Sequence, residues 1–200
     1  MPRRVPFIGL TGGLGAGKSE ALRALAELGA ATLSTDAVVH DLLQSDEVRD
    51  VVTRRLGSEV ARDGALDRSL IAERVFGDDE ARAWLEGVLW PRVGARVAAW
   101  RVALDDADPR PRAAVVEVPL LFEAGMGEVF DQTIAVVADE AVRRDRAGTR
   151  GHAAVGGRTG RQLSQEEKSQ RADFTVRNDG TVEELRRTLS HVLGKIERIT

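Results

Sequence analysis

The apolar residues of this chain fall into short runs that are separated by longer segments with helical spacing. The runs cover residues 5–10, 31–33, 113–118, 132–137 and 174–176. Continuous apolar runs of this length are typical of strands that are buried on both faces. Because the strands alternate with helices, the pattern predicts an α/β fold with a parallel five-stranded sheet flanked by helices.

A long stretch between the second and third runs has helical stripes instead of strands. Its apolar positions recur at helical spacing, first as Val48, Val51, Val52 and Leu56, and then as Trp84, Leu85, Val88 and Leu89. We therefore expect an inserted helical subdomain at residues 37–108, with the core formed by 1–36 and 109–200. Pro91 interrupts the second stripe and is expected to end or kink that helix.

Composition and charge exclude several classes of protein. A chain of 200 residues with 42% hydrophobic residues can form one core, but hardly two independent domains. The net charge of −3 and the pI near 5.7 argue against a nucleic acid or an anionic membrane as partner. The absence of cysteine excludes disulfides, thiolate metal sites and a thiol nucleophile. The histidines show no metal-ligand spacing.

The N-terminal apolar run is broken by Pro6 and Gly9, so it has the features of neither a signal peptide nor a membrane span. We expect a cytoplasmic location, and a monomer or a weak homo-oligomer.

The strongest chemical signal directly follows the first apolar run. It is the sequence Gly12-Gly13-Leu14-Gly15-Ala16-Gly17-Lys18-Ser19. This sequence fits the pattern G-x-x-x-x-G-K-[ST], in which backbone N–H groups curl around a phosphate chain. Lys18 can reach the terminal phosphates, and the Ser19 hydroxyl can complete the coordination of a magnesium ion. The alternative is a merely glycine-rich turn.

The context of this loop favours a nucleoside triphosphate site over that alternative. A strand signal precedes the loop, and a helix follows in which Leu22, Leu25 and Leu28 share one face before Gly29 ends it. The fold class is therefore that of the P-loop NTPases. The expected nucleotide-binding residues are Gly13, Leu14, Gly15, Ala16, Gly17, Lys18, Ser19 and Glu20, with Ser19 as the metal ligand.

An acidic residue follows the second apolar run. The carboxyl ends of parallel strands share the edge of the sheet that carries the phosphate loop, which places Asp36 near that loop. Phosphoryl transfer needs one group that orients the acceptor. Asp36 is the candidate for general base, for orienting the hydroxyl, or for holding a metal-bound water. It could also cap a helix that begins at Ala37, and the two roles can coexist.

The third apolar run ends in Glu117-Val118-Pro119-Leu120-Leu121-Phe122-Glu123. Glu117 could assist the magnesium shell, or it could be only a polar strand terminus. The side chains of Leu120, Leu121 and Phe122 form either an apolar wall for the acceptor or plain core.

Residues 143–161 are rich in arginine and glycine and carry no sustained apolar stripe. Such a segment is either a solvated surface loop or a cationic lid that closes over phosphates. The nearby phosphate loop favours a lid, which we place within about residues 143–165. Arg146 and Arg150 are four apart, so on a helix both guanidinium groups could meet phosphate oxygens. Arg158 and Arg161 are weaker candidates.

Taken together, these landmarks resemble the dephospho-CoA kinase family over almost the whole chain. The resemblance rests on the segments 8–19, 63–68 and 118–123, on Arg158 and Gln162, and on 166–168, 172–173 and 178–180. It implies a phosphate-loop core, a helical domain that helps to bind the acceptor, and a lid. It also implies ATP and magnesium, with the γ-phosphate passing to the ribose 3′-hydroxyl of dephospho-CoA.

The resemblance also implies roles for single residues. Asp36 matches the second aspartate of the family's Asp-Ala-Asp motif and would orient the acceptor hydroxyl. Lys18 and a lid arginine, Arg146 or Arg150, would contact the transferring phosphate, and Asn178 lies in a segment near the adenine. The matching segments place further substrate-binding residues at Arg68, Leu120, Leu121 and Glu123.

Four positions depart from the family pattern. Glu20 stands where threonine is usual, so its carboxylate either repels the phosphates or turns outward. Ser34 replaces the first aspartate of the Asp-Ala-Asp motif, Glu117 replaces an aspartate, and Trp90 replaces a histidine. Trp90 bears most directly on acceptor recognition. A related kinase with another acceptor and a non-catalytic ATP-binding module are therefore the alternatives. A switch GTPase is disfavoured because no Asn-Lys-x-Asp motif is present.

Overall fold

The computed structural model of the chain describes residues 4–62, 64–149 and 162–200. The chain divides into two compact units. The first contains Met1–Ser34 and Arg101–Thr200, and the second contains Thr35–Trp100. No helix of the described residues combines the length and the apolarity that crossing a membrane requires.

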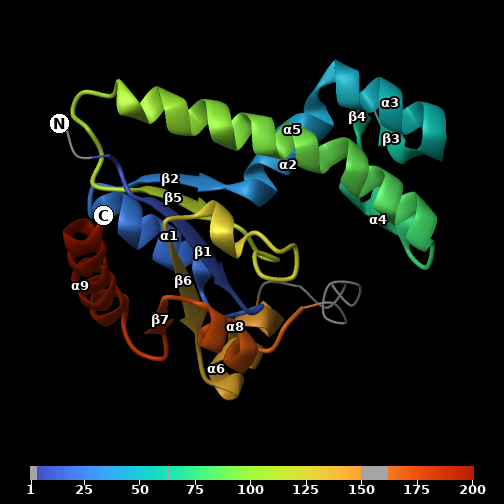
Figure 1. The fold of residues 1–200 in the computed structure, drawn as a ribbon. Coiled ribbons are helices and arrows are strands. Elements are labelled where there is room, and N and C mark those ends of the chain that lie inside the picture. The colour runs from blue at the N-terminus through green and yellow to red at the C-terminus, as the bar shows by residue number, and fades with distance from the viewer. Residues whose placement is uncertain (1–3, 63, 150–161) are drawn as a thin grey trace. The chain divides into compact units, whose positions relative to one another are not determined.

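The first unit is built on a parallel sheet (Figure 1). Its strands are β1 (Phe7–Gly12), β2 (Ala31–Ser34), β5 (Ala114–Glu117), β6 (Gln132–Val137) and β7 (Phe174–Arg177), in the spatial order β2-β5-β1-β6-β7. Each neighbouring pair is parallel. The predicted five-stranded parallel sheet is confirmed. β1 lies at its centre, so the segment that leaves β1 emerges from the middle of the sheet edge.

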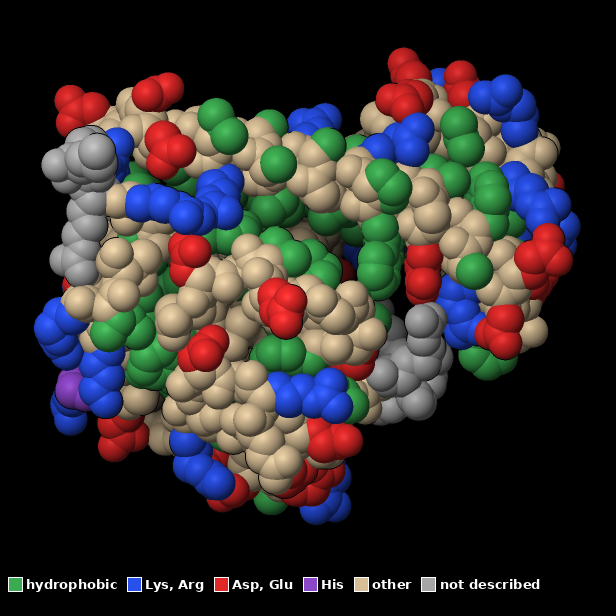
Figure 2. All heavy atoms as spheres, viewed as in Figure 1, with side chains coloured by type: hydrophobic (Ala, Val, Ile, Leu, Met, Phe, Trp, Pro, Cys, Tyr) green, Lys and Arg blue, Asp and Glu red, His purple; other side chains and the backbone are tan. Residues whose placement is uncertain are grey.

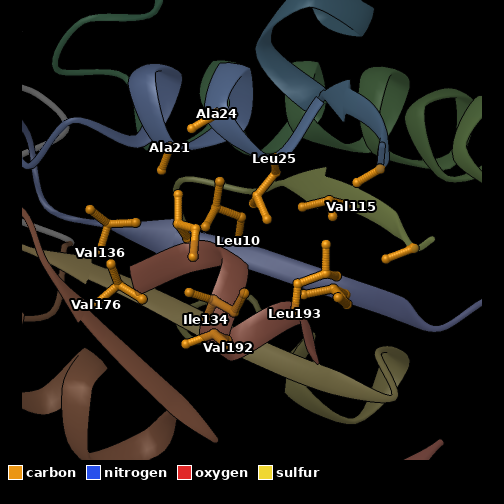
Figure 3. Packing of buried hydrophobic residues seen from close by; sticks show 14 of the residues in the cluster. Leu10, Ala21, Ala24, Leu25, Val115, Ile134, Val136, Val176, Val192 and Leu193 are labelled. Atoms are coloured by element: carbon orange, nitrogen blue, oxygen red, sulfur yellow. The ribbon is translucent and has the colours of Figure 1, made fainter. Parts of the chain in front are cut away.

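Several helices belong to the same unit as this sheet. They are α1 (Lys18–Glu27), α6 (Glu140–Thr149), α8 (Gln165–Arg171) and α9 (Val182–Ile199), together with the short 3₁₀ helix η2 (Gly127–Val129). α1 and α9 pack against each other and against the strands. Figure 3 shows the resulting cluster of buried side chains, which includes Leu10, Ile134, Leu25 and Leu193. The apolar face of α9 is thus buried in the core.

Gly9 lies in β1 between two residues of this cluster, Ile8 and Leu10. Because successive side chains of a strand point to opposite faces, position 9 faces the other side of the sheet. A Cβ atom there would lie 2.6 Å from Leu121 Cδ1 and 2.7 Å from Phe130 Cδ2. Both of these side chains are buried. The absence of a side chain at Gly9 therefore allows Leu121 and Phe130 to pack directly on β1.

The substitution Gly9→Ala is expected to lower the free energy of unfolding by about 1–3 kcal/mol, because the added methyl group overpacks this site. Gly94→Ala is the matched control, since a Cβ at Gly94 would meet no atom within 4 Å. Gly94 lies inside a helix, where alanine is favoured by up to about 1 kcal/mol. Urea unfolding of both variants measures the difference. Equal stabilities would contradict the packing described for Gly9.

The second unit is mostly helical. It contains α2 (Thr35–Gln44), α3 (Asp46–Leu56), α4 (Arg68–Val75) and most of α5 (Asp79–Asp105). The 3₁₀ helix η1 (Ser58–Val60) precedes a small antiparallel ribbon of β3 (Ala61–Arg62) and β4 (Ala65–Leu66). The helical stripe expected in α3 is buried at Val48, Val52 and Leu56. The ribbon was not predicted, because strands this short leave no readable alternation.

Pro91 was expected either to end or to kink its helix. Helix α5 does not end there. It continues to Asp105, and its residues from Arg101 onward belong to the first unit. Proline removes one backbone N–H and displaces nearby carbonyl groups within a helix. Arg92 lies next to Pro91, and its Nη1 donates to the Val88 carbonyl at 2.8 Å. Its guanidinium also forms an ion pair with Glu47 of α3.

Charged side chains are distributed over the surface. In Figure 2, basic and acidic groups are interspersed over the face shown and do not form a single basic stripe.

Candidate active site

The phosphate loop joins the end of β1 to the start of α1. Gly15 and Gly17 have φ angles of 74° and 92°, which favour glycine. A side chain at Gly17 would also collide with Asn178 Nδ2. That amide donates to the Ala16 carbonyl at 2.9 Å and is buried. The loop conformation is therefore held from outside by Asn178, which comes directly after β7.

The amino-terminal end of α1 differs from those of the other α-helices for which a cap residue is defined. Side chains cap the first turns of α3, α4, α8 and α9, and these caps are Ser45, Asp67, Ser164 and Thr181. Gly17 occupies the same position in α1 and provides no side-chain cap. The first turn of α1 therefore presents the positive end of the helix dipole with no capping side chain in front of it. This arrangement fits a phosphate group.

Cationic side chains surround the loop. Lys18 Nζ donates to the Gly13 carbonyl at 3.2 Å, which holds the ammonium against the loop backbone. Arg143 Nε donates to the Leu14 carbonyl at 2.9 Å, and Arg146 Nη1 donates to the Asn178 carbonyl at 2.9 Å. Both arginines belong to α6. The structure therefore brings Arg146, Asn178 and the loop together, as expected for one nucleotide site.

Arg143 was not predicted as an individual site residue, although it begins the arginine-rich stretch. A Cβ atom added to Gly13 would lie 3.2 Å from Arg143 Nη2, and one added to Gly15 would lie 2.5 Å from the Arg143 carbonyl oxygen. A run of several arginines carries no signal that distinguishes the one that packs on the loop. Arg150, Arg158 and Arg161 lie outside the described residues, as does most of the expected lid.

Glu20 lies in the first turn of α1, and its carboxylate forms an ion pair with Arg23 of the same helix. The Arg23 guanidinium also donates a hydrogen bond to the Glu20 carboxylate, and this bond raises the pKa of Arg23. Arg23 is exposed, so the pair lies on the surface of α1. Of the two alternatives for Glu20, the structure shows the outward one, in which arginine compensates its charge.

Glu117 ends β5 and is buried, with only 7% of its surface exposed. It is in register with Leu10 of β1 on one side and with Ser34 of β2 on the other. Its register partner Leu10 precedes Gly12, where the phosphate loop begins, by two residues. The buried Glu117 carboxylate therefore lies at the edge of the sheet that carries the loop. A strand terminus that is polar only because it meets solvent would be exposed, and Glu117 is not.

Asp36 and Arg68 both belong to the second unit. Asp36 lies in the first turn of α2, which begins at Thr35 directly after β2. The expectation that Asp36 caps a helix starting at Ala37 is therefore wrong, because the strand leads into the helix without an intervening residue. Arg68 is exposed and is the first residue of α4, after its cap Asp67.

The segment after β5 contains three predicted substrate-binding residues. Leu121 is fully buried and packs toward Gly9, so its side chain belongs to the core. Leu120 is partly exposed. Glu123 Oε1 accepts hydrogen bonds from Lys168 Nζ at 2.9 Å and from the Leu163 amide at 2.8 Å. Lys168 was not predicted as a site residue.

These features define the class of the protein. A parallel sheet with β1 at its centre, a glycine loop leading into an uncapped helix, and Lys18 with Ser19 at the loop's end are the attributes of a P-loop kinase. The family model described as dephospho-CoA kinase matches residues 6–184. The chain belongs to the dephospho-CoA kinase family.

Curated relatives agree with this assignment, and a solved structure shares the fold. The dephospho-CoA kinase of Protochlamydia amoebophila is 37% identical over 194 residues, which cover 95% of this chain and 96% of the relative. That of Deinococcus radiodurans is 38% identical over 200 residues, covering 98% and 93%. A crystal structure of a Thermus thermophilus protein superposes with a TM-score of 0.79 at 32% identity, covering 96% and 98%.

Proposed function

We propose that this kinase transfers the γ-phosphate of ATP to the ribose 3′-hydroxyl of dephospho-CoA, which yields coenzyme A. The observation that carries the proposal is the uncapped start of α1, with Lys18 held against the loop and Arg143, Arg146 and Asn178 packed around it. Membership of the dephospho-CoA kinase family supports the choice of acceptor. The cytoplasm is the proposed location, since ATP is abundant there.

The donor side of the reaction is assigned to the phosphate loop. Backbone amides from Gly13 to Ser19 would bind the phosphate oxygens, and Lys18 and Arg146 would neutralise charge on the transferring group. Ser19 is exposed at the start of α1 and would supply a hydroxyl ligand to magnesium. One hydroxyl suffices, because magnesium in such sites takes its remaining ligands from phosphates and waters. The bound ion supplies charge neutralisation for the phosphates, and Glu117 would orient its waters.

The acceptor side is assigned to Asp36. Its carboxylate would accept the proton of the 3′-hydroxyl as the hydroxyl oxygen bonds to the γ-phosphorus and the bond to ADP breaks. The second unit would help to bind dephospho-CoA, with Arg68 facing its phosphates and the exposed Trp90 contacting an apolar part. Leu120 and Glu123 would contribute from the segment after β5. The side chain of Leu121 would support this segment from the core.

The position of the new phosphate tests the proposed reaction. The protein, ATP, magnesium and dephospho-CoA are incubated, and the product is analysed by ³¹P NMR against authentic coenzyme A. We expect a phosphate monoester on the ribose 3′-oxygen and no product when EDTA is present. A phosphate at another oxygen, or product formation in EDTA, would contradict the assigned acceptor or the assigned role of magnesium.

A further inference from the structure

Lys168 is a fully buried lysine in α8, with 0% of its surface exposed. Its ammonium group lies 2.7 Å from the Pro119 carbonyl, 2.9 Å from Glu123 Oε1 and 3.4 Å from Thr11 Oγ1. An ammonium carries three protons, so these three acceptors complete its hydrogen bonding. Lys168 therefore joins α8 to the end of β1 and to the segment after β5.

The groups that Lys168 joins are those that flank the proposed reaction. Thr11 is the last residue of β1 but one, and the phosphate loop follows immediately. Pro119 and Glu123 bound the segment that we assign to the acceptor side. Thr11 is itself completely buried, and its hydroxyl lies 3.4 Å from the same Pro119 carbonyl. One cation thus fixes the donor-side strand and the acceptor-side segment against each other.

Stability alone does not account for this arrangement. A buried ion pair adds little net stability, because desolvation of both charges offsets their attraction. What the ammonium group of Lys168 does provide is a fixed position for the three acceptors that surround it.

The use of lysine supports this interpretation. Only three of the 29 basic residues of the chain are lysines. Lys18 belongs to the phosphate loop, and Lys168 contacts the strand that leads into it. A compact ammonium can direct three protons to converging acceptors, whereas the planar guanidinium of arginine cannot. In a chain that otherwise uses arginine, a buried lysine indicates that this geometry is required.

We propose that Lys168 is a positioning residue for phosphoryl transfer, which holds the entry to the phosphate loop and the segment Pro119–Glu123 in register. The inference rests on the proposed function, because only then do these two segments serve donor and acceptor. Catalysis of phosphoryl transfer depends mainly on positioning. A displacement of about 1 Å between reactants can lower the rate about 100-fold.

The test compares Lys168→Met with Lys195→Met, which is the same change at an exposed lysine of α9. We expect Lys168→Met to lower kcat for dephospho-CoA by about tenfold or more and to raise its KM. The Kd for ATP should stay within about twofold, since the loop is held separately by Asn178. Lys195→Met should match the wild type in all three. If Lys168→Met leaves kcat and KM unchanged per folded molecule, the inference is overturned.

A second pair of variants keeps the test decisive if Lys168→Met unfolds, since that change leaves the Glu123 carboxylate buried and unpaired. The double variant Lys168→Met with Glu123→Gln removes this charge, and Glu123→Gln alone is its reference. We expect the double variant to fold and to be slower than the reference by about tenfold. Equal rates would overturn the inference. Turnover by the wild type separates the two proposals, because an inactive wild type overturns the proposed function as well.

Discussion

Replacing Asp36 by alanine is expected to remove nearly all turnover with dephospho-CoA while ATP binding is retained. General-base and orienting groups contribute about 10²–10⁴-fold to such reactions. Asp36 lies in the first turn of α2, where a carboxylate adds about 0.3–1 kcal/mol through the helix dipole. Thermal unfolding of the variant shows that the loss of turnover is measured on folded protein. Steady-state kinetics and a fluorescent ATP analogue measure the two effects separately.

Asp41 provides the matched control for this prediction, because it is an exposed aspartate of the same helix. Asp41→Ala should retain wild-type kinetics. Unchanged turnover in Asp36→Ala would refute the assigned role of Asp36. Loss of ATP binding in this variant would place Asp36 on the donor side of the reaction instead.

The substitution Lys18→Met is expected to lower kcat by about 10²–10³-fold, because it removes a cation from the transferring phosphoryl group. It should also raise the Kd for ATP. The loop itself should persist, since the positive φ angles of Gly15 and Gly17 and the Asn178 hydrogen bond to Ala16 do not involve the lysine. Thermal unfolding without nucleotide should match the wild type. Turnover within about twofold of the wild type would rule out this role for Lys18.

The three central strands β1, β5 and β6 were predictable because they are buried on both faces. Such strands are continuous apolar runs, and the predicted run 132–137 coincides with β6. The strand 114–117 was predicted to within one residue at each end. Local patterns failed where tertiary context decides the outcome. Helix α5 continues through Pro91, and helical periodicity does not decide between a kink and an end at a proline.

The phosphate loop was predictable because its shape depends on backbone conformation. The glycines of the phosphate loop are required by local φ angles, so their spacing is visible in the sequence. Lys168 was missed because its contacts are not local. Thr11 is 157 residues away from it. In the sequence, Lys168 follows two glutamates and resembles any solvated charge, and polar groups become buried only when distant partners satisfy them. Arg143 was missed for the same reason.

We propose that this chain phosphorylates dephospho-CoA. The most direct measurement is a coupled assay of ADP release by the purified protein with ATP and magnesium, in which dephospho-CoA, pantetheine and adenosine are offered as separate acceptors. We predict turnover with dephospho-CoA alone, which would show that Ser34 and Trp90 are tolerated at their positions. No turnover with dephospho-CoA, despite measurable ATP binding, would contradict the claim, as would faster turnover with either other acceptor.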